Sequence, residues 1–461
     1  MNIRKLLTRL VSLALIAVFL PTVAMADTWY LEDGSITVSA TDSGQNVSQG
    51  GVTKEDSAPV IRNRDSSAST TNNVTIRADT GATANVTLED TNIDTTGGAG
   101  PNGAGDAAVR TEGGGNVNLN VELDNTLQSG NTRAGVEKGN GGNLTIGSES
   151  GSGQLVATGG DGGAGIGGGE NTGAENITIT GGDIFAIGNG GGAGIGGGWD
   201  CSASDITITG GRVTAVGGNY SAGIGGGYGS NGENITISDA EVIAIGGTCS
   251  AGIGGGCRNL DSTAAGEGKN ISISGSANVK AAGGVGDSMD GAGAAIGAGG
   301  SHQGTTLVDA QEGDVGTSGL SPDGSVERLD PGTTFDIPQP KPRSSFLTAS
   351  AEPQPVKAAL YRVIDETGKA LPVETKQEDG VLLLTAQADI AILEGAISGL
   401  QTLQSRGIDT ITFTNGTISV SFSLAEVIAK GASSDVYRLT LSGGEANFTL
   451  ADADITALLG K

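Results

Sequence analysis

Three aromatic residues lie close together in a chain that is only 3% aromatic. Trp199 and Tyr228 are 29 residues apart, and Tyr220 precedes Tyr228 by eight positions. Asp200 and Asn219 are their immediate neighbours in the sequence. Aromatic faces with polar neighbours are a common way of holding sugar rings, through apolar packing and hydrogen bonds. These five residues are the candidate carbohydrate-binding site, and the alternative is that the rings merely cover a loop.

Catalytic side chains are scarce. The only histidine is His302, which argues against Ser-His-Asp and His-metal sites. Asp183, Arg212 and Glu241 recur at an interval of 29, so neighbouring rungs of a repeat would hold acid, base and acid side by side. A polysaccharide lyase or glycoside hydrolase could use such a column, but a surface ion-pair ladder explains it equally. We expect no catalytic residues, with a lyase or hydrolase as the alternative.

Two Gly-rich motifs imitate cofactor sites. Residues 163–168 match the dinucleotide fingerprint, but the motif recurs along the chain and no helix follows it. Residues 160–163 resemble a calcium-binding β-roll, yet Gly190 replaces Asp161 in the next copy. We therefore expect no organic cofactor, and single calcium ions on loops are possible.

The three cysteines are Cys201, Cys249 and Cys257, an odd number that does not fit a disulfide scaffold. Cys249 and Cys257 flank a predicted strand and would be about 25 Å apart if it is extended. Cys201 lies two rungs from Cys257, at about 10 Å, beyond the Cα limit for a disulfide unless a loop moves. We expect structural cysteines without an obvious pair.

A 29-residue repeat organises the middle of the chain. Residues 164–169, Ala-Gly-Ile-Gly-Gly-Gly, recur at 193–198, 222–227 and 251–256, and a degenerate copy follows at 295–299. Each unit holds three short runs with strand periodicity, separated by Gly-Gly or polar turns. Three strands and three turns form one triangular coil, and stacked coils bury a continuous apolar column. The expected inward ladders are Ile177, Ile206 and Ile235, and Ile166, Ile195, Ile224 and Ile253.

Weaker copies extend the repeat towards the N-terminus. Val109 and Val136 take the position of Ile166, and four Asn-led segments, at 73–76, 85–88, 116–119 and 143–146, have the pattern of one strand type. The solenoid is predicted to run from about residue 30 to about 316. An Asn or Asp precedes one strand repeatedly, which predicts a ladder of side-chain hydrogen bonds at a corner of the coil. Its members are Asn143, Asn176, Asp205, Asn234 and Asn270.

These ladders, Gly-rich turns and corner Asn residues resemble the right-handed parallel β-helix of pectate-lyase-like proteins. The Ala-Gly-Ile-Gly-Gly-Gly and Ile-Thr-Ile-Thr-Gly-Gly repeats resemble secreted β-helix proteins of anaerobic Gram-positive bacteria, which are often called carbohydrate-binding. The resemblance covers residues 30–316 and implies an all-β fold. It also implies a polysaccharide or cell-surface glycan as the partner, by analogy of family and fold. An extracellular scaffold or adhesion role fits the same resemblance.

One face of the coil suggests another function. Thr178 and Thr180 alternate with the inward Ile residues, and Thr207, Thr209 and Thr236 continue the outward columns. Flat Thr ladders order surface water in ice-binding solenoids. The alternative is the ordinary preference of Thr for solvent-facing strands.

The N-terminus indicates export. Arg4, Lys5 and Arg9 precede a short apolar stretch and the small-x-small pattern of residues 24–26, so residues 1–26 are a predicted signal peptide. No later stretch is long enough to span a membrane. The whole chain has a formal charge of −26, and removal of the signal peptide with its three basic residues leaves a mature chain of −29. This acidity disfavours a nucleic-acid partner, and we expect an extracellular or surface-associated protein.

The C-terminal third has a different composition. Residues 317–357 hold seven of the 11 prolines and are predicted to form an extended linker. Residues 358–461 follow as a small α+β module. Residues 390–404 have helical spacing, and the Asn415-Gly416 turn predicts a hairpin.

Overall fold

A computed structural model describes two parts of the 461-residue chain. The first part is residues 27–333, with gaps at 98–104, 259–263, 304–305, 311, 314 and 318–319. The second is residues 361–460, with gaps at 367–370, 372, 379, 387, 406–407, 432–434 and 452. The predicted signal peptide and residues 334–357 of the predicted linker lie outside the described residues. The chain divides into compact units at Ser345.

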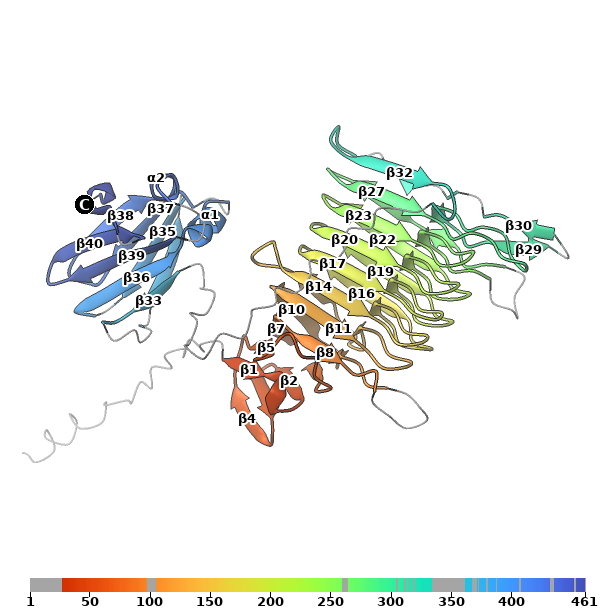
Figure 1. The fold of residues 1–461 in the computed structure, drawn as a ribbon, viewed down its shortest axis with the longest axis horizontal. Helices are drawn as coiled ribbons and strands as arrows, with labels where there is room; N and C mark the ends of the chain where they lie inside the picture. The colour runs from red at the N-terminus through yellow and green to blue at the C-terminus, as the bar shows by residue number, and fades with distance from the viewer. Residues whose placement is uncertain are drawn as a thin grey trace, which may run out of the picture. The chain divides into compact units, whose positions relative to one another are not determined.

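Three sheets form a right-handed parallel β-helix in the first unit (Figure 1). The first sheet contains β1 (Thr28–Tyr30), β5 (Val60–Arg62), β7 (Thr83–Glu89), β10 (Asn116–Glu122), β13 (Leu144–Gly147), β16 (Ala174–Ile179), β19 (Ala203–Ile208), β22 (Gly232–Ser238), β25 (Gly268–Lys269), β26 (Ile271–Ser274) and β31 (Val315–Gly316). The second contains β8 (Asn92–Asp94), β11 (Asp124–Gln128), β14 (Gln154–Thr158), β17 (Asp183–Ile187), β20 (Arg212–Val216), β23 (Glu241–Ile245), β27 (Asn278–Ala282) and β32 (Ser325–Leu329). The third contains β2 (Ile36–Thr41), β3 (Gly44–Gln49), β4 (Val52–Glu55), β6 (Val74–Ala78), β9 (Val109–Glu112), β12 (Val136–Glu137), β15 (Ile166–Gly167), β18 (Ile195–Gly196), β21 (Ile224–Gly225), β24 (Ile253–Gly254) and β28 (Ile296–Gly297).

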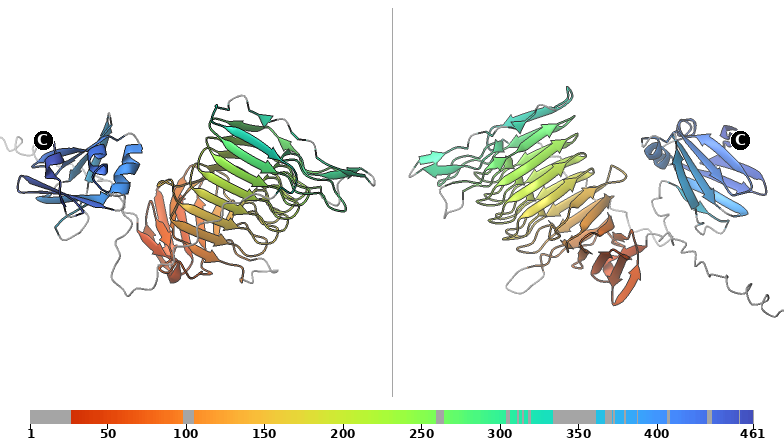
Figure 2. Two further views of the ribbon diagram at one scale, coloured as in Figure 1. Left: turned by 45° about the horizontal axis from the view of Figure 1, so that its top comes forward. Right: turned by 180° about the vertical axis from the view of Figure 1, so that it is seen from behind.

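The strand register confirms the 29-residue repeat. Ile177 pairs with Ile206 and Ile206 with Ile235 in the first sheet. The Ile166 ladder of the third sheet also pairs in register, and Val136 pairs with Val109 and Ile166 as predicted. All of these side chains have no exposed surface. Because one coil cannot enclose its own apolar face, the stack visible in Figure 2 is the unit that buries the core.

The corner ladder of Asn and Asp is also present, in part. Asn234 donates its side-chain amide to Asp205 at 3.1 Å, and Asn270 donates to Asn234 at 3.0 Å. These residues and Asn176 adopt φ values between 53° and 57°, a left-handed conformation that Asn and Asp tolerate better than most residues. Asn143 does not adopt it. The column therefore turns the chain at a corner and links neighbouring coils.

In the coils that carry the Ala-Gly-Ile-Gly-Gly segment, the third-sheet strands β15, β18, β21 and β24 are only two residues long, because this segment reverses the chain. The N–H of Ala222 donates to the carbonyl of Gly226 at 3.0 Å, and Ala193 and Gly197 repeat this bond at 2.9 Å. Gly225 has a φ of 132°, and a Cβ there would collide with the carbonyl of the next coil. Glycine is thus required where successive turns stack backbone on backbone.

Two details of the predicted solenoid are wrong. The segment at residues 73–76 belongs to the third sheet, where β6 pairs with β2 and β9, whereas the other three Asn-led segments are in the first sheet. Their local patterns are alike, and the pairing partner decides the sheet. The stack also continues past residue 316, since β32 pairs with β27 inside the predicted linker. A hairpin of β29 (Ser301–Gln303) and β30 (Thr306–Val308) projects near this end.

The second unit is a small domain with a five-stranded and a four-stranded sheet. Residues 390–404, predicted as one helix, form strand β36 and then helix α1. β36 begins with four consecutive apolar residues and has an antiparallel neighbour on each side. The predicted Asn415-Gly416 hairpin is present as β37 and β38. Its elements are β33 (Arg362–Ile364), β34 (Val373–Glu378), β35 (Val381–Ala386), β36 (Ile390–Ala396), α1 (Ile397–Ser405), β37 (Thr410–Thr414), β38 (Ser419–Ser423), α2 (Leu424–Ile428), β39 (Val436–Ser442), β40 (Glu445–Leu450) and β41 (Ala453–Asp454). Within the described residues, no helix is long and apolar enough to cross a membrane.

Candidate functional site

The turn of the third sheet brings together residues that are eight positions apart. Its two arms meet because the Ala-Gly-Ile-Gly-Gly segment folds back on itself. Successive coils place four different pairs at this one corner, which we call the turn corner. The pairs are Gly162 with Glu170, Gly191 with Trp199, Tyr220 with Tyr228, and Cys249 with Cys257.

The three predicted aromatic residues meet at the turn corner. The ring centroids of Trp199 and Tyr228 are 5.0 Å apart with planes at 60°, and those of Tyr220 and Tyr228 are 5.5 Å apart at 52°. Trp199 and Tyr228 therefore pack edge to face, and Tyr220 is tilted against Tyr228. The short turn brings Tyr220 and Tyr228 into contact although they are eight positions apart.

Exposure separates the roles of the rings. Tyr228 is only 7% exposed and supports its neighbours, whereas Trp199 is 37% exposed. A Cβ built on Gly191 would lie 2.5 Å from Cε3 of Trp199 and 2.9 Å from its Cδ2, so the indole lies across bare glycine backbone. Asp200 and Asn219 are exposed at the same corner. Trp199 is the ring most accessible to a ligand.

Tyr220 connects the aromatic rings to a residue two coils later. Its hydroxyl donates to a carboxylate oxygen of Asp287 at 3.3 Å. Burial raises the pKa of the Tyr220 phenol, and the nearby Asp287 carboxylate raises it further. Burial opposes ionisation of Asp287, but the N–H groups of Met289 and Asp290 donate to this carboxylate and lower its pKa overall. Tyr220 is half-buried with a φ of 66°, which a non-glycine residue rarely adopts.

The cysteine prediction was wrong. Cys249 and Cys257 form a disulfide, with Cα atoms 5.2 Å apart, and Cys201 is free. The error came from assuming an extended strand where the chain makes a tight turn. The equal spacing of Tyr220 and Tyr228 one coil earlier was the signal that could have found the pair.

Behind the disulfide lies a buried ion pair that sequence reasoning missed. Nε of Arg258 donates to Asp290 at 2.7 Å, and Nδ1 of His302 lies 3.2 Å from the same carboxylate. Donor atoms of Cys249, Cys257 and Asp290 lie within 4.8 Å of one another. The two sulfurs are joined to each other and the carboxylate is held by Arg258, so we interpret these three residues as a structural cluster.

The predicted column of Asp183, Arg212 and Glu241 is in register. Arg212 holds Asp183 through two hydrogen bonds, one of them 3.1 Å long, and Asp183 is only 8% exposed. The Asp183 side chain raises the pKa of Arg212. The acid most enclosed in the column is thus neutralised by its neighbour, which fits the ion-pair ladder better than a pair of facing catalytic carboxylates.

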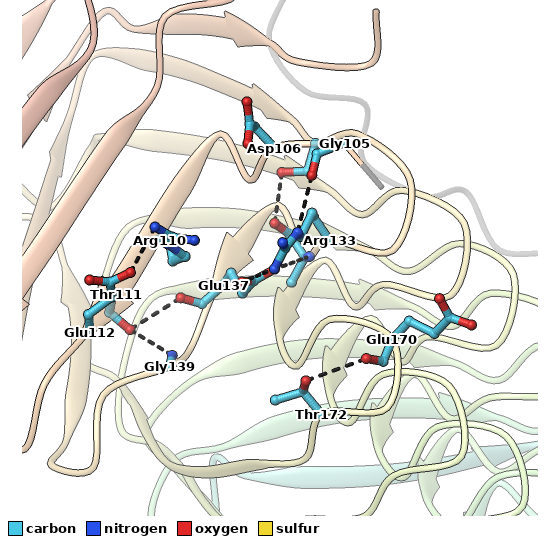
Figure 3. Close-up of polar contacts among 12 residues, drawn as sticks. Gly105, Asp106, Arg110, Thr111, Glu112, Arg133, Glu137, Gly139, Glu170 and Thr172 are labelled. Atoms are coloured by element: carbon cyan, nitrogen blue, oxygen red, sulfur yellow. Dashed lines mark hydrogen bonds and ion pairs between the residues drawn. The ribbon is translucent and has the colours of Figure 1, made fainter. Parts of the chain in front are cut away.

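A second charged cluster occupies an earlier coil (Figure 3). Here Glu137 and Lys138 take the positions of the glycines that follow the Ile of the turn in later coils. This difference between the copies is visible in the sequence and could have indicated the cluster. Glu137 accepts from Arg133 at 3.1 Å, and burial raises its pKa. Lys138 is 5% exposed and donates to the carbonyl of Asn140. Burial lowers the Lys138 pKa from 10.5 to about 8.

Comparison with known proteins agrees with this geometry. The profile of a family described as "Beta helix repeat" matches residues 177–199, 206–228 and 235–257. The chain is a β-helix repeat protein. Each matched copy of this β-helix repeat protein ends at an equivalent position of the turn corner, at Trp199, Tyr228 or Cys257. No curated protein and no solved structure matches the chain.

Proposed function

We propose that this β-helix repeat protein is secreted and binds polysaccharide without catalysis, through the turn corner around Trp199. The observation that carries the proposal is an indole that lies on glycine backbone and keeps 37% of its surface exposed. The equivalent residue is Glu170 in the preceding coil, Tyr228 in the next and Cys257 in the one after that, so stacking of the coils does not itself require tryptophan. An accessible aromatic face offers apolar contact area to a ligand, and polar groups beside it can fix the orientation of that ligand.

The surroundings of Trp199 suit a polar ring. Asp200 and Asn219 provide exposed carboxylate and amide groups near the indole, and sugars present hydroxyls around an apolar face. Tyr228 and Tyr220 pack against one another behind it and hold the indole in place. Export is supported by the leader pattern of residues 1–26 and by a disulfide, which persists in oxidising compartments.

The test is retention on a glycan array, with calcium and with a chelator. Trp199→Ala should weaken retention at least about tenfold, since it removes the contact face. Asp200→Ala and Asn219→Ala should weaken it less. Tyr30→Ala is the matched control, because this half-buried ring lies in β1 at the other end of the stack. All variants should keep the wild-type circular dichroism spectrum.

Three results would contradict the proposal. Trp199→Ala could bind as well as the wild type, or Tyr30→Ala could lose as much, and either result would place the contact elsewhere. Failure to retain any glycan would leave a scaffold or adhesion role. Shortened or unsaturated products would show a hydrolase or lyase.

A further inference from the structure

A buried carboxylate at the first coil lies in contact with the backbone nitrogen of Asp27, the residue that follows the predicted signal peptide. We propose that cleavage after Ala26 turns this nitrogen into an ammonium group, which forms a buried ion pair with Asp56 and completes the N-terminal end of the β-helix. This inference rests on the export that is part of the proposed function. It adds the processing site and the contact that processing creates.

Asp56 is a buried acid that lacks a cationic side chain as partner. It has no exposed surface. Across the described parts of the chain, no lysine, arginine or histidine forms an ion pair with it, and the nearby Lys54 binds the Asp27 carboxylate instead. A carboxylate removed from water is costly unless an opposite charge compensates for it. One cation at this place would therefore stabilise the fold.

Three N–H groups point at the Asp56 carboxylate. Nε1 of Trp29 donates to Oδ2 at 2.8 Å, and the backbone nitrogen of Asp27 donates to the same oxygen at 3.1 Å. The N–H of Ala58 donates to Oδ1 at 3.1 Å. The Asp27 nitrogen thus lies at hydrogen-bonding distance before it carries any charge.

Both partners are held in place by the backbone. The carbonyl of Asp27 accepts from the N–H of Val60 at 2.9 Å, next to the pairing of β1 with β5. The N–H of Asp56 donates to the carbonyl of Gln45 at 3.0 Å, and the buried Gln45 amide donates back to the Asp56 carbonyl at 3.0 Å. The ion pair therefore forms without rearrangement of the chain.

Cleavage supplies the missing charge. Hydrolysis of the Ala26–Asp27 peptide bond by a signal peptidase consumes one water and leaves a carboxylate on Ala26 and an amine on Asp27. The amine takes up a proton from water below its ordinary pKa of about 8. Before cleavage the same nitrogen is a neutral amide. A charge-assisted hydrogen bond is roughly twice as strong as a neutral one, so the mature chain gains a contact that the precursor lacks.

The ion pair implies a specific pH dependence. Besides Asp56, the charged groups around the amine are the Asp27 carboxylate with its partner Lys54, and the exposed Glu55. The Asp56 carboxylate favours the protonated amine, so the folded chain keeps this proton to a higher pH than the unfolded chain. The stabilisation is therefore fully present below about pH 7.5 and is lost as the pH rises through the pKa of the folded state.

The experiment compares two purified forms of the chain, one that begins at Asp27 and one that retains Ala26. Retention of Ala26 keeps an N–H donor on Asp27 and removes only the charge from this nitrogen. At about pH 7 the form that begins at Asp27 should unfold at least about 2 °C higher, and the difference should disappear above about pH 10. Asp56→Asn should abolish the difference, and Asp42→Asn, at an exposed acid near the N-terminal end, should preserve it.

Amine labelling provides a readout that does not depend on unfolding. An acylating reagent attacks only the deprotonated amine, so the pH profile of labelling, followed by mass spectrometry of the N-terminal peptide, gives the pKa of this group. That pKa should lie about one unit higher in the wild type than in Asp56→Asn, which corresponds to about tenfold slower labelling at pH 7. Equal pH profiles would overturn the inference, as would a difference in unfolding temperature that survives in Asp56→Asn or above pH 10.

Processing and glycan binding fail separately. Mass spectrometry of the protein secreted with its own signal peptide locates the mature N-terminus, and a first residue other than Asp27 would overturn this inference alone. Absence of export would contradict both this inference and the export in the proposed function. Glycan retention through Trp199 is measured on the purified chain and should be the same in Asp56→Asn as in the wild type.

Discussion

Cys249 and Cys257 lie on the two arms of one turn, with Cα atoms 5.2 Å apart, and they occupy the positions that Tyr220 and Tyr228 take one coil earlier. One backbone geometry thus holds a covalent bond in one coil and a packed aromatic pair in the coil before it. The disulfide closes the end of the aromatic row, next to the coil that supplies Asp287.

Removing the disulfide should destabilise the β-helix. Cys249→Ala with Cys257→Ala frees a short loop, which should lower the free energy of unfolding by about 2 kcal/mol. Thermal unfolding followed by circular dichroism measures this loss. Cys201→Ser is the control and should unfold like the wild type with and without reductant. A double variant as stable as the wild type would contradict the disulfide.

Gly191→Ala should displace Trp199. The new Cβ would lie 2.5 Å from the indole and 3.1 Å from Cβ of Tyr228, so the ring has to move. We expect a stability loss of about 1–3 kcal/mol from overpacking. Glycan retention should fall as it does in Trp199→Ala, and tryptophan fluorescence should shift. Gly181→Ala is the control, since its nearest neighbouring atom is 3.7 Å away, and a similar effect there would refute a role specific to Gly191.

Lys138→Met should stabilise the protein at neutral pH. Burial lowers the folded-state pKa of Lys138 from 10.5 to about 8, so below pH 8 both states are protonated and the cost of the buried charge is fully present. Between pH 8 and 10.5 the unfolded chain binds more protons, so wild-type stability rises with pH as that cost disappears. The variant should gain about 1–3 kcal/mol at pH 7 and nothing above pH 10.5.

Chemical denaturation at several pH values measures the Lys138 effect. Lys280→Met, at an exposed lysine of the second sheet, provides the comparison and should show no such gain. A gain at Lys138 that is constant from pH 7 to 10.5 would mean that packing, and not charge, is responsible.

The repeat itself was readable from the residues. Ile177, Ile206 and Ile235 are 29 apart, and because buried strands stack in register, spacing alone placed them in one ladder. The aromatic trio, the ion-pair column and most of the corner Asn column followed from the same alignment. Each depends on equivalent positions in successive coils, which a period fixes.

The path of the chain within a coil was decided only by the tertiary structure. Two-residue strands and backbone contacts between glycines reverse the chain at each turn. No local sequence pattern predicts how sharply the chain turns there. That reversal joins Cys249 to Cys257, sets Tyr220 against Tyr228 and lays Trp199 over Gly191. The period determined which coil each residue occupies, whereas packing between coils determined which residues touch, because contact at a turn depends on the backbone of neighbouring rungs.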